Sequence, residues 1–381
     1  MTAVSGDEAV SVVAPATVLG VLATVVGPWW PGAGKVLVHL ADPEARWLIT
    51  VARHGARAPG AVVAWPGGWA GGLLAAAVLV VLVLAARHRR VRLVLAVLVV
   101  GALLVFVPVR VFAPAWPPRD WAMVECDVGQ GDAVVLATAE PGRAVVVDTG
   151  PEPGPVDDCL HRLAVERIPL LVLSHLHADH IGGLASVFDG RSVGAVAVGP
   201  GRAPEWAWRQ VAAEARKQEV PLVELNPGER MDWPGLTLDV LGPRYVPART
   251  AGPQDGTTIN NSSVVLRAQT PAGRVLLTGD VELAAQSDLL AGIGDLEAEV
   301  LKVPHHGSRY SSPAFLAAVA PRVALVSVGA GNTYGHPSKS TMDTLGALGA
   351  LVTRTDLDGD TAVVTGTAIV RRGEPRGPPR R

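Results

Sequence analysis

The chain has 381 residues, a formal net charge of −2, 49% apolar residues and only 18% charged residues. This composition excludes a broad polybasic surface of the kind that binds nucleic acid through charge alone. The apolar excess lies mainly before residue 115, so the two parts of the chain predict different environments.

Three long apolar segments in the first 112 residues predict helices that cross a membrane. Residues 9–34 and 61–86 each run 26 residues without a charge, and residues 93–109 add 17 more. A hydrocarbon core of about 30 Å needs about 20 such residues as a helix, and about 17 is the lower edge of that range. We expect the second span to be confined to about 68–86. The alternative, buried helices of a soluble domain, fits segments of this length and Leu, Val and Ala content poorly.

The charged residues around these segments predict the orientation of the chain. Residues 35–57 mix charges into an apolar pattern, which indicates an amphipathic helix in the membrane interface or along a channel wall. Between the second and third spans, Arg87–Arg92 contains four arginines, and such short loops stay cytoplasmic. Arg110 and Arg119 favour the opposite orientation, but they are only two arginines, compared with the four in 87–92. We therefore expect a multi-pass protein of the cell membrane whose part after the third span is extracytoplasmic.

A proline-rich linker at 113–120 separates this membrane region, 1–112, from a domain at 121–370 in which strands and helices alternate. Residues 371–381 are a basic tail for which we expect disorder. Two sheets packed face to face, with helices outside, would bury the apolar strands on both faces. Strands are expected at 122–127, 133–138, 144–148, 170–174, 195–198, 236–241, 263–268, 275–278, 300–303, 323–328 and 362–365, and helices at 156–165, 204–218, 281–290, 313–320 and 338–348.

Four residues of metal-binding types follow the apolar run 169–173: His175, His177, Asp179 and His180. Because side chains alternate along an extended backbone, the first two histidines lie on one side of the chain. The other two residues turn the opposite way and can serve a second ion. Imidazole nitrogens and a carboxylate suit Zn²⁺, Mn²⁺ or Fe²⁺. The alternative is a chance cluster on a surface loop, in a chain with ten histidines.

The remaining ligands are expected downstream, because this loop alone cannot complete two sites. Asp280 closes the run 275–279 and could bridge two cations about 3.5–4 Å apart, one oxygen to each. Its alternative roles are a turn aspartate or the N-cap of the following helix. One of His305 and His306 is the expected last ligand of the second ion, the alternative being a structural histidine. His336, after a further strand, is the third candidate.

Together these motifs resemble a metallo-β-lactamase-fold hydrolase over residues 121–366. More narrowly, they resemble the soluble domain of ComEC-type DNA-uptake channels. The fold that the resemblance implies is an αββα sandwich. The narrower resemblance rests on the order and spacing of Asp127–Ala133, Asp148–Gly150, His175–His180, Leu277–Asp280, His305–Ser308 and Tyr334–Pro337.

The resemblance implies a set of metal ligands and divides it between two ions. The implied ligands are His175, His177, Asp179, His180, Asp280 and His306. The first two would hold one ion and the next two the other. Asp280 would lie between the ions, and His306 would complete the second site.

Other residues have supporting roles in the resemblance. Asp148 would order the metal loop, and His305 would be a neighbour of the second site. Asp179 and His336 are the candidate catalytic residues. His336 could donate a proton to the leaving oxygen or form a hydrogen bond with a phosphate. Ser308 is expected to cap a helix or turn, and a phosphate contact is the alternative.

One departure from the family pattern concerns the first ion. Most dinuclear enzymes of this fold carry another histidine before the bridging aspartate, but none occurs here between His180 and His305. The corresponding stretch contains Asn260 and Asn261, whose amide oxygens suit Mn²⁺ better than Zn²⁺. The expected cofactor is therefore one or two divalent ions, zinc or manganese, with the first site weak or filled only when substrate is present.

The two cysteines, Cys126 and Cys159, are too few for a disulfide framework. We expect Cys126 in a strand as part of the core and Cys159 at the start of a helix. A pair between them is compatible with an extracytoplasmic location, but nothing in the sequence indicates it.

Three functions are compatible with this sequence. The first is DNA internalisation in natural transformation, with the outer domain acting as a metal-dependent nuclease on the strand that does not enter. The second is a membrane-anchored hydrolase of another phosphodiester or ester, such as a choline phosphodiester or a lactone. The third is a non-catalytic scaffold domain of the channel. Attachment to apolar spans favours the first over the second, and the intact ligand set argues against the third.

The partners expected for the first function are DNA and the membrane. A complete channel of the family has more spans than this sequence contains. Further channel helices are therefore expected from another chain or from a missing N-terminal part.

Overall fold

A computed structural model describes residues 116–244 and 255–373 of the protein. Within the first 115 residues it describes 20–27, 29–30, 32–41 and scattered positions between 76 and 101. The chain divides into two compact units, Met1–Val111 and Phe112–Arg381. In the first unit, helical backbone occupies 20–26 and 32–41.

The predicted membrane spans lie largely outside the described residues, as does most of the predicted interfacial helix. Among the residues that the structure describes, no helix is both long enough and apolar enough to cross a membrane. The prediction of transmembrane helices is therefore not confirmed. The predicted disordered tail also lies mostly outside the described residues.

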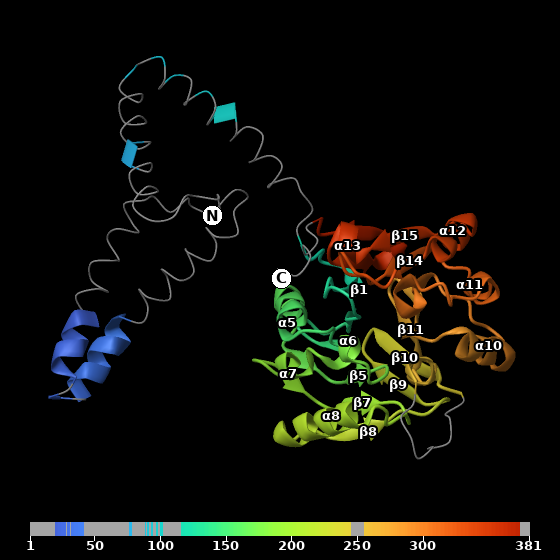
Figure 1. The fold of residues 1–381 in the computed structure, drawn as a ribbon, viewed down its shortest axis with the longest axis horizontal. Helices are drawn as coiled ribbons and strands as arrows, with labels where there is room; N and C mark the ends of the chain where they lie inside the picture. The colour runs from blue at the N-terminus through green and yellow to red at the C-terminus, as the bar shows by residue number, and fades with distance from the viewer. Residues whose placement is uncertain are drawn as a thin grey trace. The chain divides into compact units, whose positions relative to one another are not determined.

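The second unit is built on two large sheets (Figure 1). The first sheet has eight strands in the order β17-β16-β1-β2-β3-β5-β7-β8. From β3 through β5 and β7 to β8 the strands are parallel, and the other pairs are antiparallel. Its strands are β1 (Trp121–Glu125), β2 (Val134–Ala137), β3 (Ala144–Val147), β5 (Leu171–Leu173), β7 (Val196–Val198), β8 (Leu222–Glu224), β16 (Thr361–Val364) and β17 (Ile369–Arg371).

The second sheet has seven strands in the order β15-β14-β13-β12-β11-β10-β9. From β12 to β15 the strands are parallel, and from β9 to β12 they are antiparallel. Its strands are β9 (Arg230–Trp233), β10 (Leu236–Gly242), β11 (Val265–Thr270), β12 (Gly273–Leu277), β13 (Val300–Lys302), β14 (Val323–Val326) and β15 (Leu351–Arg354). A small parallel pair joins β4 (Arg167–Ile168) to β6 (Ser192–Val193).

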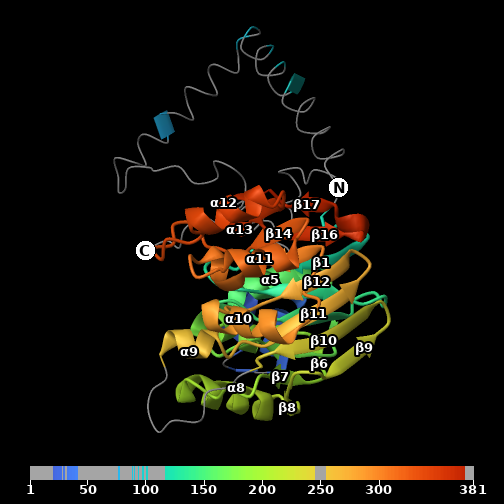
Figure 2. The same cartoon turned by 90° about the vertical axis from the view of Figure 1, so that its right-hand side faces the viewer.

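Helices cover the outer face of each sheet, as the two views show (Figures 1 and 2). The first sheet is covered by α5 (Pro153–Arg162), α7 (Leu184–Val187) and α8 (Glu205–Lys217). The second is covered by α10 (Leu283–Gly292), α11 (Pro313–Val319) and α12 (Lys339–Ala347). The remaining short helices are α6 (Ala178–Ile181), α9 (Gly256–Asn260), α13 (Thr355–Asp358), η1 (Pro304–Gly307) and η2 (Thr365–Thr367).

Alternation of side chains along single strands explains why both faces of each sheet are buried. In β3, Val145 and Val147 pack in the core between the sheets, whereas Val146 packs against the outer helices. In β12, Leu277 lies between the sheets and Leu276 faces α10 and α11. Every position of β3 is apolar, as are the last three positions of β12, and this is the pattern that the sequence shows. The predicted αββα sandwich is therefore present.

Loops carrying polar residues leave the carboxyl ends of parallel strands in both sheets. In the first sheet, β3 leads to Asp148 and β5 to His175. In the second, β12 leads to Asp280 and β13 to His306. Ligand sites in α/β sheets characteristically form at this end of the strands.

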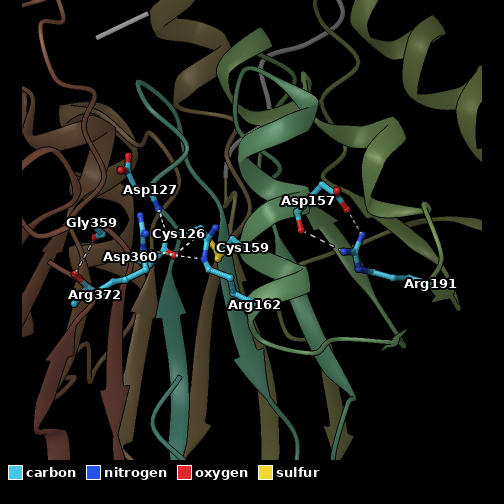
Figure 3. Close-up of a disulfide and its surroundings, with 10 residues drawn as sticks. Cys126, Asp127, Asp157, Cys159, Arg162, Arg191, Gly359, Asp360 and Arg372 are labelled. Carbon is cyan, nitrogen blue, oxygen red and sulfur yellow. Dashed lines mark hydrogen bonds and ion pairs between the residues drawn. A yellow bond between two sulfur atoms is a disulfide. The ribbon is translucent and has the colours of Figure 1, made fainter. Parts of the chain in front are cut away.

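A disulfide between Cys126 and Cys159 joins the end of β1 to α5 (Figure 3). The sequence did not indicate this pair. It joins residues 33 positions apart, and in the chain-entropy account a loop of that size stabilises the fold by about 3–4 kcal/mol. Beside it, the buried carboxylate of Asp360 accepts hydrogen bonds from Asp127 N and Arg162 Nε, both at 2.9 Å. These bonds hold β1, α5 and the start of β16 together.

Candidate metal centre

Asp148 orders the loop between β5 and α6. Its carboxylate accepts hydrogen bonds from Ser174 N and Ser174 Oγ, both at 2.7 Å, and from His180 Nδ1 at 2.9 Å. Burial raises the pKa of Asp148, although the neighbouring His180 acts in the opposite direction. Because His180 is held through Nδ1, its Nε2 is the nitrogen left to face the centre.

Four of the predicted ligands form a compact group that we call the buried cluster: Asp179, His180, Asp280 and His306. One ligand atom from each lies within 4.8 Å of the others. Asp280 Oδ2 lies 3.4 Å from His180 Nε2 and 3.4 Å from His306 Nε2. Asp179 Oδ2 lies 3.4 Å from His306 Nε2. Residues that follow strands of both sheets therefore converge on one point.

The donor atoms of the buried cluster fit a divalent metal ion. His180 Nε2 and His306 Nε2 are buried and form no hydrogen bond within the described part of the chain. Two such nitrogens beside two carboxylates are a donor set suited to Zn²⁺ or Mn²⁺. His306 Nδ1 donates to the carbonyl of Ser327 at 3.0 Å, so this ring is also held by its outer nitrogen.

The electrostatics of the buried cluster favour charged side chains. Burial alone would lower the pKa of His180 and of His306, but several carboxylates, Asp280 first among them, raise both well above the ordinary value. Burial would raise the pKa of Asp280, yet the two imidazoles hold it well below its usual range. A metal ion binding here would displace the imidazole protons, because only the neutral ring is a ligand.

An unusual backbone turn presents His306 to the buried cluster. His305, His306 and Gly307 have φ angles of 48°, 55° and 79°. This left-handed conformation costs a non-glycine residue roughly 1–2 kcal/mol. His305 lies beside the cluster, with Nδ1 3.3 Å from Glu282 Oε1 and Nε2 3.8 Å from Asp280 Oδ2. The structure therefore places His306 in the cluster and His305 next to it.

The other two predicted ligands, His175 and His177, form what we call the histidine pair. His175 Nε2 lies 3.1 Å from His177 Nδ1. Burial lowers the pKa of both imidazoles, and that of His175 falls well below the ordinary value. Both rings are therefore neutral at pH 7, the form that binds metal. The side chain of Asn260 is buried beside His177.

Three buried charged residues next to the cluster were missed by the sequence analysis: Glu125, Asp132 and Lys302. Lys302 Nζ contacts the Asp132 carboxylate, donates to the carbonyl of Gly279 at 3.1 Å, and lies 3.6 Å from Asp280 Oδ1. Burial alone would lower the pKa of Lys302, but Asp132 and Asp280 raise it, so the lysine is a fixed cation. Asp280 thus presents Oδ2 to the cluster and Oδ1 to Lys302.

These three residues do leave a signal in the sequence. Lys302 is a lone charge in the apolar run 300–304, and Glu125 ends an equally apolar strand. Asp132 belongs to a motif of the resemblance, but the resemblance implies no individual role for this residue. Burial first, and then the charge of Asp132, raise the pKa of Glu125 from 4.5 to about 8.

The centre opens into a cleft of about 780 Å³. His177, Asp179, Asp280 and His306 line this cleft, and so does His336. The His336 ring lies 6.2 Å from the His306 ring, centroid to centroid. Burial, and next the neighbouring His305, lower the pKa of His336 to about 4, so its imidazole is neutral at pH 7.

Two further predicted residues make structural contacts outside the cluster. Ser308 Oγ accepts a hydrogen bond from Tyr310 N at 3.3 Å, which closes a turn. Asn261 Oδ1 accepts hydrogen bonds from Glu282 N at 2.9 Å and Ala285 N at 3.2 Å, at the start of α10. Asp280 is not the N-cap of α10, because that position is Glu282.

Two sheets flanked by helices, with a His/Asp cluster at the ends of their parallel strands, define a hydrolase fold of the metallo-β-lactamase type. The model of the Metallo-beta-lactamase superfamily matches residues 126–329. The chain belongs to this superfamily.

Within it, the curated relatives include competence proteins. ComE operon protein 3 from Bacillus subtilis (strain 168) is 27% identical over 252 residues, which cover 61% of this chain and 31% of the relative. Competence protein ComA from Neisseria gonorrhoeae is 31% identical over 251 residues, which cover 64% of this chain and 32% of the relative. The chain thus spans about a third of the length of these relatives. The resemblance to ComEC-type proteins is confirmed.

Among solved structures, the metallo-beta-lactamase fold protein YhfI from Bacillus subtilis matches with a TM-score of 0.40 and 12% identity. The match covers 65% of this chain and 99% of YhfI.

Proposed function

We propose that this chain hydrolyses phosphodiester bonds of DNA with one or two divalent metal ions, during the uptake of DNA across the cell membrane. The observation that carries the proposal is the buried cluster, whose free imidazole nitrogens and carboxylates converge beside an open cleft. All four of its members belong to motifs of the DNA-uptake resemblance. The relative from Neisseria gonorrhoeae is named a competence protein.

Each group at the centre has a proposed role. The buried cluster would hold the second ion, and the histidine pair would hold the first. Asp280 would help to hold both ions; its Oδ2 faces the cluster imidazoles and its Oδ1 lies 3.6 Å from Lys302 Nζ. Divalent ions at such a centre lower the pKa of water and neutralise charge on a phosphoryl group. The neutral ring of His336 would donate a hydrogen bond to a phosphoryl oxygen in the cleft.

Contact with DNA would come from the cleft and not from a general positive charge. A net charge of −2 gives little long-range attraction for phosphates. Tyr334 lines the cleft and is 74% exposed, so it offers an aromatic face to an unstacked base. Stacking of this kind contributes about 1–3 kcal/mol per base. We therefore expect single-stranded DNA, the proposed non-transported strand, to be cut faster than duplex.

The domain after the third predicted span is proposed to lie outside the cytoplasm. The arginines of 87–92 support this orientation, and the Cys126–Cys159 disulfide supports it independently, because disulfides are rare in the cytosol. Glu205→Cys, at an exposed position of α8, should label with an impermeant thiol reagent in intact cells. His88→Cys should stay unlabelled until the cells are lysed. The reverse pattern would invert the orientation and remove this part of the proposal.

The activity is tested with the purified full chain in detergent. Labelled single-stranded and duplex DNA should be cut when Mn²⁺ is supplied, and cutting should stop with a chelator. Asp280→Ala should abolish cutting. Turnover of a choline phosphodiester or a lactone without DNA cleavage would support the alternative hydrolase. Bound metal without any hydrolysis would support the scaffold.

A further inference from the structure

The histidine pair is short of ligands for an ion of its own. His175 and His177 provide two nitrogens, and the charges of two carboxylates, Asp179 and Asp280, act on both rings. No histidine occurs between positions 180 and 305 of the sequence. An ion on the pair therefore needs a further protein ligand of another type, or water.

Asn260, at the end of α9, has a free oxygen in the right place. Its side chain is buried, lies next to His177 and lines the same cleft. Its Oδ1 is buried and accepts no hydrogen bond from any residue that the structure describes. A buried amide oxygen without a partner is costly, so it indicates a group that would complete it.

Glu282 determines which atom of the Asn260 amide is left free. Asn260 Nδ2 donates to Glu282 Oε1 at 2.9 Å. Because a carboxylate can only accept, the amide nitrogen must face Glu282 and the oxygen must face away. Glu282 is itself fixed, since Oε2 accepts from Thr257 Oγ1 at 3.1 Å and its backbone amide donates to Asn261.

The side-chain oxygen of the adjacent Asn261 is not free, so this residue provides an internal comparison. Its Oδ1 already accepts from the backbone amides of Glu282 and Ala285. These bonds satisfy amides that the first turn of a helix leaves unpaired. The sequence leaves two candidate asparagines, and the hydrogen bonds distinguish a capping residue from one with a free oxygen.

We infer that Asn260 Oδ1 is the oxygen ligand of the first ion, together with His175 and His177, and that Glu282 is its positioning residue. The inference rests on the proposed function only in requiring that the centre binds metal. An amide oxygen with two imidazoles and a carboxylate suits Mn²⁺ better than Zn²⁺. Asn260 thereby makes the first site selective for the harder ion, while the buried cluster accepts either.

The test measures metal binding directly, without DNA. The full chain is titrated with Mn²⁺ and, separately, with Zn²⁺, bound metal is counted by mass spectrometry, and paired Mn²⁺ ions are detected by electron paramagnetic resonance. Wild type should bind two Mn²⁺ ions with unequal affinity and give a spin-coupled signal. Asn260→Ala should lose the weaker ion and the coupled signal while the stronger ion stays, which also shows that the variant is folded. Glu282→Ala should weaken the same ion by about 10–100-fold, as loss of an orienting group does.

Two further variants separate this inference from its alternatives. Asn260→His should restore the second ion and raise its affinity for Zn²⁺ relative to Mn²⁺. Asn261→Ala should lower thermal stability, as loss of a helix cap does, but leave both ions bound. Two ions with unchanged affinities in Asn260→Ala, or equal losses in the two alanine variants, would overturn the inference. Retention of both ions by Asp280→Ala would instead remove the proposed centre itself.

Discussion

The buried cluster and the histidine pair belong to one centre but differ in how they are held. His180 and His306 are fully buried, and each is fixed through its outer nitrogen, to Asp148 and Ser327. The cluster also contains two carboxylates. His177 is half-buried, and the pair brings no carboxylate of its own. For the proposed two-ion centre, this difference predicts a firmly held ion at the buried cluster and an ion at the histidine pair that exchanges with the cleft.

The largest effect is expected from a substitution that removes the proposed ions of both the buried cluster and the histidine pair. Asp280→Ala deletes a buried carboxylate that faces both cluster imidazoles and whose charge also acts on the histidine pair, so both ions should be lost. DNA cleavage should fall by about 10³-fold or more, at or beyond the loss of about 10²–10³-fold for a single transition-state donor. Bound metal and initial rates check this. Asp288→Ala, an exposed aspartate on the adjacent helix α10, is the control and should behave as wild type. Cleavage by Asp280→Ala at the wild-type rate would refute the assignment.

Lys302→Met should lower the free energy of unfolding, because the charge that it removes is buried. It removes the lysine cation that faces the buried carboxylates of Asp132 and Asp280, and so leaves their negative charge only partly compensated. Breaking such a pair destabilises a fold by about 3–5 kcal/mol. Urea denaturation measures the change. The exposed Lys217, which pairs with Glu214 on the surface, provides the control Lys217→Met, whose midpoint should not move measurably. Equal midpoints for the two variants would show that Lys302 is not needed.

Single histidine variants sharpen the comparison between the two groups. His306→Ala should weaken the firmly held ion and abolish cleavage at any Mn²⁺ concentration. His177→Ala should weaken only the exchangeable ion, so that raising Mn²⁺ by about 100-fold restores part of the rate, given losses of 10–100-fold for groups that support a metal. Mn²⁺ titrations of the cleavage rate distinguish the two. Identical titration curves would mean that the two groups act as one site.

The smallest expected effect concerns pH and Glu125. Its pKa in the folded state, about 8, lies above the ordinary 4.5, so its contribution to stability is complete below pH 4.5 and is lost as pH rises to about 8. Glu125→Gln removes this titration. The free energy of unfolding should therefore fall less steeply with pH in the variant than in wild type over that interval. Parallel curves from pH 5 to 8 would show that Glu125 does not titrate there.

The sandwich could be predicted from the sequence because several of its central strands contain uninterrupted apolar runs. All four residues of β3 and the last three of β12 are apolar and buried, so both faces of the sheet are covered there. The strands β8, β9, β15 and β17 were missed, as were the short strands β4 and β6. They lie at sheet edges, and Arg230–Trp233 and Leu222–Glu224 are partly exposed and polar. An edge strand buries too little surface to leave the same pattern.

The candidate site was predictable where its residues are neighbours in the chain. The ligand types within 175–180 point to metal binding without any knowledge of the fold. The roles of Lys302, Asp132 and Glu282 were not predictable, because each depends on a partner that is distant in the sequence and that only the folded chain brings near. The disulfide between Cys126 and Cys159 is hidden for the same reason. Local spacing reveals chemistry, whereas contacts between distant segments need the structure.

The left-handed turn through His305, His306 and Gly307 sets a trade-off between the stability of the fold and its affinity for metal. Folding the chain into that turn costs roughly 1–2 kcal/mol for each non-glycine residue. In the folded protein, the His306 imidazole therefore already has the orientation in which it would bind an ion. Substitutions that relax the turn should raise the free energy of unfolding. They should also slow the binding of a metal ion and speed its release. Selection for a more stable fold and selection for a tighter metal centre would therefore act against each other at His305 and His306.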